Sequence, residues 1–299
     1  MSMPNFLIIG AAKAGTTALY HSLKVHPQIY MSPVKEPKFF AFEGVQVDWQ
    51  GPGDQEAFSN YITDIKDYHK LFEEVSHEIA IGEASPWYIC SPRAAERIQY
   101  HIPDVKLIAI LRDPADRAYS QFLHLVRNGR EVLTDFTQAL QEEEYRVSKN
   151  WGWTWQYRNR GFYYNQLKPY FDRFNHDQIK VYLYEDWNAD PINILKDIFQ
   201  FIGVEENFVP NISSRHNVSV IPKNKYLHNV LTKPNLLKSI LKPLIPNGIR
   251  YDLINRLKSQ NLTKPPLLPQ VRKQLIQVYR EDILKLQDLI HRDLSKWLQ

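Results

Sequence analysis

Short apolar runs rich in β-branched residues alternate with helical patterns along most of this chain of 299 residues. The runs predict strands over Asn5–Ile9, Gln28–Met31, His77–Gly82, Lys106–Leu111 and Ile179–Tyr184. The other patterns predict helices over Thr16–Val25, over Pro92–His101 with Ser91 as its N-cap, from about Pro114, and over Pro191–Ile202 before Gly203. Strands separated by helices form βαβ units, so we predict the α/β class, with a mainly parallel sheet flanked by helices.

The C-terminal part of the chain differs in character. From about Lys223 onward we find helical periodicity interrupted by prolines and no convincing strand. Because no internal repeat divides the chain, we predict one domain over residues 1–299, with an α/β core (1–222) and a helical C-terminal lobe (223–299) packed on it. The stretch Pro234–Ile254 is amphipathic and basic, and packing on the core explains it better than contact with a membrane.

Composition excludes several classes of protein. Cys90 is the single cysteine, so an internal disulfide and a cysteine-based metal site are both excluded. The histidines show no ligand spacing, and we expect no metal. No apolar run approaches the ~20 residues that cross a bilayer, and no signal-peptide pattern is present, so we expect a cytoplasmic protein without a transmembrane segment. Lys and Arg form no stripe that would bind nucleic acid, and nothing indicates an oligomeric state.

One glycine-bearing turn carries a first chemical signal. Residues 6–19 (FLIIGAAKAGTTAL) are typical of a strand, a tight turn and a helix, which together direct backbone N–H groups and the helix dipole at one spot. Gly10 and Gly15 have the Walker A spacing, but Thr16 stands where lysine should follow, and Lys13 lies inside the loop. The segment therefore predicts a P-loop-type anion site that is not a kinase loop. By itself, a tight turn with an incidental lysine explains it equally well.

A second signal lies at another strand end. In residues 106–124 (KLIAILRDPADRAYSQFLH), Arg112 ends the strand and Ser120 lies about two turns into the next helix. Parallel strands deliver their carboxyl ends to one edge, where Arg112 could bind a phosphate beside the glycine loop. Taken alone, Arg112 is better explained by a salt bridge to Asp113 or Asp116.

Together these segments resemble the sulfotransferase family that uses 3′-phosphoadenosine 5′-phosphosulfate (PAPS), in the bacterial branch similar to heparan sulfate sulfotransferases. Further segments match in order along nearly the whole chain: KEPKFF (35–40), IGEASPWY (81–88), YEDW (184–187) and the C-terminal YREDILKLQDLIHRDLSKW. The resemblance implies PAPS as sulfo donor, 3′-phosphoadenosine 5′-phosphate (PAP) as product, and no metal. It also implies a donor site made of Lys13, Ala14, Gly15, Thr16, Thr17, Arg112 and Ser120.

The resemblance further implies two catalytic residues. Lys13 would neutralise charge on the leaving phosphate oxygen, and Glu36 in KEPKFF would be the general base for the acceptor hydroxyl. A positioned base contributes typically ~10²–10⁴-fold. Without the resemblance, Glu36 is better explained as a loop charge flanked by lysines.

The acceptor is implied only as a class, a hydroxyl of a carbohydrate-like or other alcohol. Lys38 stands where relatives often have histidine, so it could contact the sulfo group or an anionic acceptor. Trp153, Trp155 and Arg158 in WGWTWQYRNRGFYY are further candidate substrate contacts, although aromatic packing explains that segment as well. In the EASP segment, Ala84 replaces a lysine of some relatives, so no glycan contact carries over there.

Two other functions stay open at this point. A Mg²⁺-dependent kinase could use the same strand, loop and helix, although the lysine after Gly15 is missing. A non-catalytic nucleotide-binding protein is the third possibility. The resemblance also places Arg215–Asn217 and Lys264 where the family's C-terminal region closes over the nucleotide, and Trp87 is a possible stacking partner for adenine.

Overall fold

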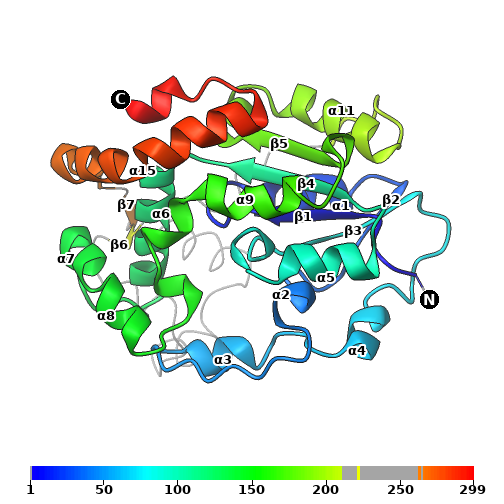
Figure 1. The fold of residues 1–299 in the computed structure, drawn as a ribbon. Coiled ribbons are helices and arrows are strands. Elements are labelled where there is room, and N and C mark those ends of the chain that lie inside the picture. The colour runs from blue at the N-terminus through cyan, green and yellow to red at the C-terminus, as the bar shows by residue number, and fades with distance from the viewer. Residues whose placement is uncertain (1, 211–220, 223–261, 264) are drawn as a thin grey trace, which may run out of the picture.

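A five-stranded parallel sheet forms the centre of the molecule. The computed structural model describes residues 2–210, 221–222, 262–263 and 265–299. The strand order is β2, β3, β1, β4, β5 (Figure 1), and every neighbouring pair is parallel. The strands are β1 (Phe6–Gly10), β2 (Ile29–Met31), β3 (Ala80–Ala84), β4 (Lys106–Leu111) and β5 (Ile179–Leu183).

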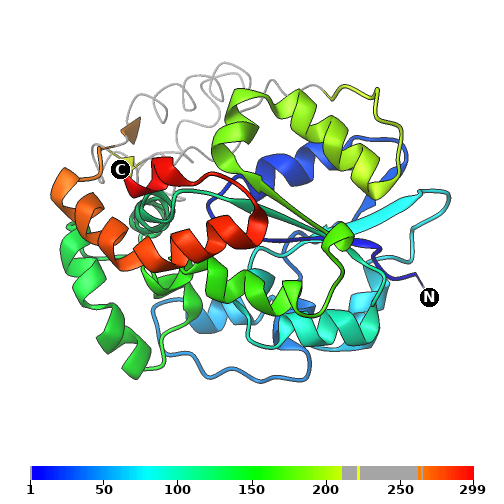
Figure 2. The same ribbon diagram turned by 45° about the horizontal axis from the view of Figure 1, so that its top comes forward.

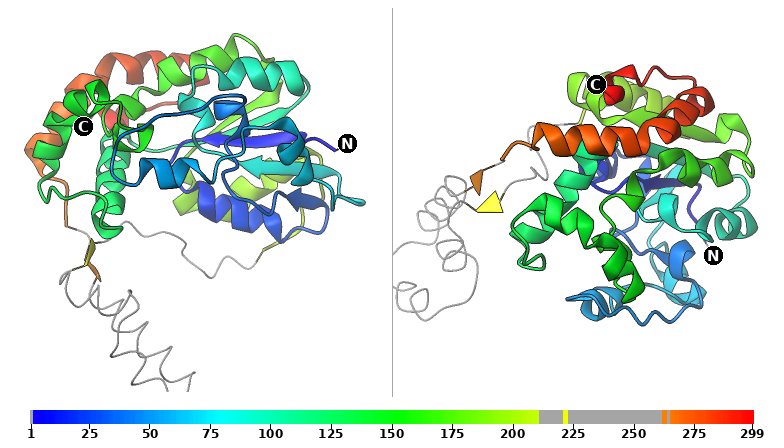
Figure 3. Two further views of the ribbon diagram at one scale, coloured as in Figure 1. Left: turned by 90° about the horizontal axis from the view of Figure 1, so that it is seen from below. Right: turned by 60° about the vertical axis from the view of Figure 1, so that its left-hand side comes forward.

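Helices cover both faces of this sheet. In Figures 2 and 3, α1 and α11 lie on one side, and α5, α9 and α15 lie on the other. The described α-helices are α1 (Thr16–Lys24), α2 (Phe39–Phe42), α3 (Asp54–Phe58), α4 (Ile65–Lys70), α5 (Ala94–His101), α6 (Pro114–Arg127), α7 (Phe136–Gln141), α8 (Glu143–Ser148), α9 (Tyr163–Phe171), α10 (Tyr184–Ala189), α11 (Pro191–Ile202) and α15 (Pro269–Ile290). Short 3₁₀ turns are η1 (Tyr88–Cys90), η2 (Trp153–Trp155), η3 (Asn159–Gly161), η4 (His176–Gln178) and η5 (Ser295–Leu298). The predicted α/β class is thus confirmed.

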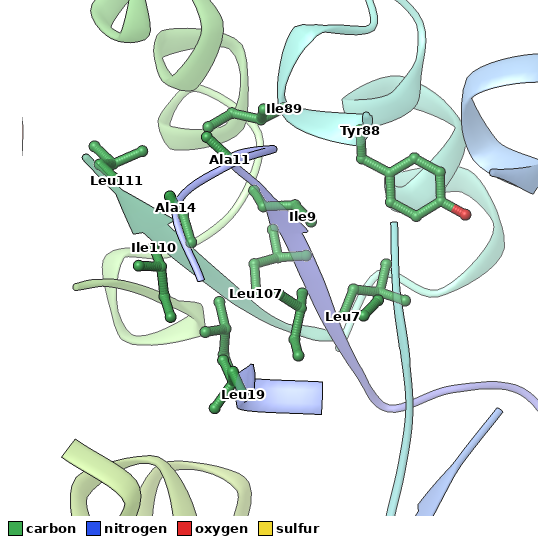
Figure 4. Packing of buried hydrophobic residues seen from close by; sticks show 14 of the residues in the cluster. Leu7, Ile9, Ala11, Ala14, Leu19, Tyr88, Ile89, Leu107, Ile110 and Leu111 are labelled. Carbon is green, nitrogen blue, oxygen red and sulfur yellow. The ribbon is translucent and has the colours of Figure 1, made fainter. Parts of the chain in front are cut away.

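The hydrophobic core fixes the central strand β1 against its neighbour β4. Leu7 and Ile9 of β1, Leu107 and Ile110 of β4 and Leu19 of α1 are fully buried in one cluster (Figure 4). Burial of each leucine or isoleucine stabilises the fold by roughly 1.5–3 kcal/mol. The carboxyl ends of β1 and β4 are therefore held side by side, and the candidate site lies at these ends.

Two predicted elements have the predicted bounds, four differ by one residue at one or both ends, and two differ by more. The strand Lys106–Leu111 and the helix Pro191–Ile202 are confirmed, and Gly203 ends α11 with a left-handed φ of 83°. The strand predicted at His77–Gly82 is wrong in position, because β3 pairs with β1 through Gly82 opposite Phe6 and extends to Ala84.

The helix predicted from Pro92 also starts later than predicted. It begins at Ala94, with Arg93 rather than Ser91 as N-cap. The buried Ser91 hydroxyl makes no hydrogen bond within the described part of the chain, so it does not supply the cap that the sequence suggested.

The C-terminal part contains one long described helix. α15 packs against α9 and α6. The prediction of no strand is wrong for Leu262–Thr263 (β7), which pairs antiparallel with Ile221–Pro222 (β6). The stretch Pro234–Ile254, Arg215–Asn217 and Lys264 all lie outside the described residues.

Candidate active site

The loop between β1 and α1 forms the first wall of the site. Lys13 and Gly15 both have left-handed backbone angles, with φ of 72° and 98°. A side chain at Gly15 would be strained by that φ and would also lie 3.2 Å from the ring of Tyr184. The first backbone N–H groups of a helix have no partner inside it, so the start of α1, with the buried Thr16 and half-buried Thr17, presents donors to this loop.

Arg112 lies at the end of β4 and reaches this loop. Its guanidinium donates from Nη1 to the backbone carbonyl of Lys13 at 3.2 Å. It also lies 4.8 Å from the centroid of the Tyr184 ring. The backbone carbonyl of Arg112 accepts a hydrogen bond of 3.0 Å from the hydroxyl of Tyr163, which fixes the chain where it leaves the strand.

The salt bridge that would have explained Arg112 as a structural residue is not formed. Among the described residues, Asp113 and Asp116 pair with Arg272 of α15 instead, at 2.6 and 3.1 Å. Asp113 also caps α6 by accepting from the backbone of Ala115 and Asp116. The guanidinium of Arg112 is therefore left to contact the loop.

Arg112 and Ser120 line one pocket. It has a volume of about 280 Å³, and its other walls come from α6 and residues 265–267. Ser120 is almost fully buried on α6. The pocket thus brings together Arg112, which follows β4, and the hydroxyl of Ser120, which lies in the helix after the turn.

Glu36 lies on a loop with its carboxylate bound by three neighbours. Lys35 Nζ contacts Oε1 at 2.7 Å, and Trp87 Nε1 and Lys38 Nζ lie 3.2 and 3.5 Å from Oε2. Burial alone would raise the pKa of Glu36. The charges of the two lysines and the hydrogen bonds from Lys35 and Trp87 outweigh burial and lower this pKa to about 2. Glu36 is therefore ionised at neutral pH.

Lys13 and Glu36 lie within electrostatic range of each other. Burial, together with the charges of Arg127 and Arg112, lowers the pKa of Lys13 to about 8, whereas Glu36 acts in the opposite direction. The loop lysine is still protonated at pH 7. The structure thus brings the two predicted catalytic residues into one electrostatic environment.

Lys38 lies beside the same carboxylate. Its ammonium is 4.0 Å from the centroid of the Tyr61 ring and 4.9 Å from that of Trp87. Burial lowers the pKa of Lys38 and Glu36 partly offsets this effect, so that the resulting pKa is about 8. Both ring contacts and the partial pairing with Glu36 keep the amine at the candidate site.

A buried carboxyl group supports the loop that carries Glu36 and Lys38. Glu83 of β3 accepts hydrogen bonds from the hydroxyls of Tyr88 (2.5 Å), Ser85 (2.9 Å) and Tyr68 (3.3 Å). Ser85 Oγ in turn accepts from the backbone N–H of Lys38 at 3.0 Å. Burial raises the pKa of Glu83 to about 7 against these hydrogen bonds. The sequence patterns did not mark Glu83, because the predicted strand ended at Gly82 and only the structure places this carboxylate inside β3.

His124 is a further candidate that the sequence patterns did not mark. It lies one helical turn after Ser120 on α6. Burial lowers its pKa to about 4, and the charges of Lys13 and Arg127 act in the same direction, whereas that of Glu36 raises it. His124 is therefore close to both predicted catalytic residues. Its four-residue spacing from Ser120, which places both on one helix face, is the signal that could have marked it.

The structure separates the candidate acceptor contacts. Trp153 stacks on Trp87, with ring centroids 6.0 Å apart, and so lies beside the site. Trp155 is 1% exposed and donates from Nε1 to Asp54, so it packs in the core. The guanidinium of Arg158 pairs with the exposed Glu144 at 2.9 Å. Other partners hold both side chains in this arrangement, and their contact with an acceptor stays a prediction.

Trp87 does not offer a free face to adenine. Lys38 and Arg160 lie over its ring, and Trp153 stacks on it. Within the described ranges, His, Cys, Asp and Glu side chains form no group of three or more that could hold a metal. Over the same residues, no helix has the length and hydropathy needed to cross a membrane.

Comparison with known proteins gives a consistent result. A family model described as the sulfotransferase domain matches residues 3–233. The crystal structure of a sulfotransferase from Alicyclobacillus acidocaldarius is 34% identical, covers 100% of both chains and has a TM-score of 0.79. The bifunctional heparan sulfate N-deacetylase/N-sulfotransferase 4 of Mus musculus is 27% identical over 99% of this chain, which spans only 31% of that protein. The membrane-associated sulfotransferase kil1 of Dictyostelium discoideum is 24% identical over 87% of this chain and 67% of its own.

Proposed function

Because the chain belongs to the sulfotransferase domain family, we propose that it transfers a sulfo group from PAPS to a hydroxyl of a carbohydrate-like or other alcohol acceptor. One observation supports PAPS as the sulfo donor. Arg112 Nη1 lies 3.2 Å from the backbone carbonyl of Lys13, so the two elements that we propose to bind the anionic groups of the donor meet at one sheet edge. PAPS has a phosphosulfate and a separate 3′-phosphate, and it supplies an activated sulfo group.

The residues of the site fit such a donor. The loop residues Lys13–Thr17 would bind the 5′-phosphosulfate through backbone N–H groups, the helix dipole and the Lys13 amine. Arg112 and Ser120, which line one pocket, would bind the 3′-phosphate. A kinase would have lysine at position 16, where this chain has threonine.

Catalysis would come from positioning and charge. Glu36 would accept the proton of the acceptor hydroxyl while that oxygen bonds to sulfur. Lys13 would stabilise the negative charge on the phosphate oxygen as its bond to sulfur breaks. A pKa of about 2 keeps Glu36 ionised but makes it a weak base, so we expect its contribution near the lower end of the ~10²–10⁴-fold range.

The acceptor would approach beside Lys38 and Trp153, next to the Trp87 ring that both of them contact. These side chains border Glu36 through the Trp87 hydrogen bond and the Lys38 ion pair. Aromatic faces suit sugar rings and other apolar surfaces of alcohols. The relative from mouse carries heparan sulfate in its name, and this favours a carbohydrate acceptor for the chain. A cytoplasmic location remains a prediction.

A binding and transfer experiment tests the proposal. Thermal unfolding is measured with PAP and, separately, with ATP and Mg²⁺. PAPS carrying ³⁵S is then incubated with a panel of alcohols and oligosaccharides, and products are identified by mass spectrometry. We expect stabilisation by PAP without Mg²⁺ and label transfer to at least one hydroxyl. Stabilisation by ATP with Mg²⁺ alone would favour a kinase. Binding of PAP without transfer to any acceptor would favour a non-catalytic protein.

A further inference from the structure

Two arginines are buried behind the site with most of their hydrogen-bond donors unused. Arg117 of α6 is 1% exposed and Arg160 of η3 is 5% exposed. In the part of the chain that the structure describes, Nε and Nη1 of both residues have no hydrogen-bond partner, and no carboxylate pairs with either guanidinium. A buried charge without a partner is strongly destabilising, by several kcal/mol.

The contacts that these arginines do make are weak or uncharged. Arg117 donates from Nη2 to the backbone carbonyl of Tyr157. Arg160 donates from Nη2 to Cys90 Sγ at 3.3 Å, and its guanidinium lies 4.1 Å from the Trp87 ring centroid. A thiol is a weak acceptor and an indole ring offers only its quadrupole, so neither neutralises a full charge.

The two cations belong to one environment. η3 packs directly against α6. Burial lowers the pKa of Arg117, and the charge of Arg160 lowers it further. The carboxylate of Glu143 also acts on Arg117, but both of its oxygens accept backbone N–H groups, from Arg158 and Asn159. One negative charge therefore faces two positive charges, and one positive charge remains uncompensated.

We propose that this region binds a small monovalent anion, chloride in solution, between the guanidinium groups of Arg117 and Arg160. Among the described residues, four nitrogen atoms with six N–H groups lack a partner and supply the ligands, and the charge balance fits one negative charge. Because these nitrogen atoms are buried, a small inorganic ion fits better than an organic anion. The proposal does not depend on the sulfotransferase function, since neither arginine belongs to the donor site.

Anion-dependent stability is the first test. The chain is unfolded by heat in sodium chloride and in sodium gluconate at equal ionic strength. We expect the Tm to rise by about 2–4 °C for each tenfold increase in chloride above the dissociation constant and to stay constant in gluconate. Equal Tm values in the two salts would overturn the proposal and leave bridging water as the partner of these donors.

Substitution of one arginine is the second test, because it should stabilise the chain in the absence of chloride. In Arg160→Met the dependence on chloride should disappear, and in gluconate the variant should be more stable than the unmodified chain, because an unpaired buried charge has been removed. Arg173→Met, which removes an exposed arginine, is the matched control and should retain the full chloride dependence. Chloride dependence that persists in Arg160→Met would place the ion elsewhere and refute the site.

Direct localisation does not depend on any variant folding. Crystals grown in sodium bromide should give an anomalous difference peak between the two guanidinium groups. If Arg117→Met, the reciprocal variant, fails to fold, this peak and the Arg160→Met result still decide the question. Crystals with bromide bound elsewhere and none at this position would contradict the proposal.

Discussion

Arg112 and Lys13, which are 99 residues apart in the sequence, meet through a hydrogen bond of 3.2 Å from the guanidinium to the backbone carbonyl. Neighbouring parallel strands β1 and β4 create this contact, because both deliver their carboxyl ends to one edge of the sheet. The arginine therefore supports the loop that carries the lysine, and it also lines the pocket that it shares with Ser120.

Arg112→Gln should weaken binding of PAP by about 10–100-fold, because a charge-assisted hydrogen bond to phosphate contributes ~1.5–3 kcal/mol. Adenosine 5′-phosphosulfate, which lacks the 3′-phosphate, should lose much less affinity. Isothermal titration calorimetry measures both ligands, with Arg173→Gln as a surface control. Equal losses for both ligands would mean that Arg112 acts only through the loop.

Glu36→Gln should lower kcat about 100-fold or more while the affinity for PAP stays nearly unchanged, because the amide keeps the shape but is a far poorer proton acceptor. Single-turnover transfer from labelled PAPS measures the effect. Glu43→Gln, which alters a carboxylate that pairs with His101 away from the site, serves as the control. Turnover that survives intact in the Glu36 variant would remove this residue from the mechanism.

The pH dependence of kcat/KM should show an alkaline limb near pH 8. Lys13 has a lowered pKa of about 8 in the free protein, so its charge is present below that pH and is lost as the pH rises through it. In Lys13→Arg the limb should move to higher pH, whatever the rate at its plateau. Lys38 has a similar pKa, so Lys38→Arg identifies which lysine is responsible. A limb that moves only in the Lys38 variant would contradict the assignment to Lys13.

Glu83 should make the fold less stable as the pH rises. Its pKa is raised from 4.5 to about 7, so the stabilising proton is fully bound below about pH 4.5 and is lost as the pH rises through 7. The shift corresponds to at most about 3 kcal/mol. In Glu83→Gln the fall in stability between pH 5 and 8 should be smaller by about this amount. Urea unfolding at several pH values measures the difference, and parallel curves for the two proteins would refute it.

Local patterns in the chain were sufficient for the sheet and for placing Arg112 beside the glycine loop. Strand and helix periodicities, the turn at Gly10–Gly15 and the helix start at Pro114 are encoded by neighbouring residues, so they could be predicted without any long-range contact. The rule that parallel strands end at one edge then predicted that Arg112 and the glycine loop share a cleft.

Only the tertiary structure decided what each charged side chain pairs with. Arg272, from the last long helix, takes Asp113 and Asp116 away from Arg112, and no local pattern indicates this. Packing likewise buries Trp155 and leaves Trp153 beside the site, although the two residues lie only two positions apart in the sequence. Secondary structure depends on residues close in sequence, whereas the partners and pKa values of buried charges depend on residues brought together from distant segments.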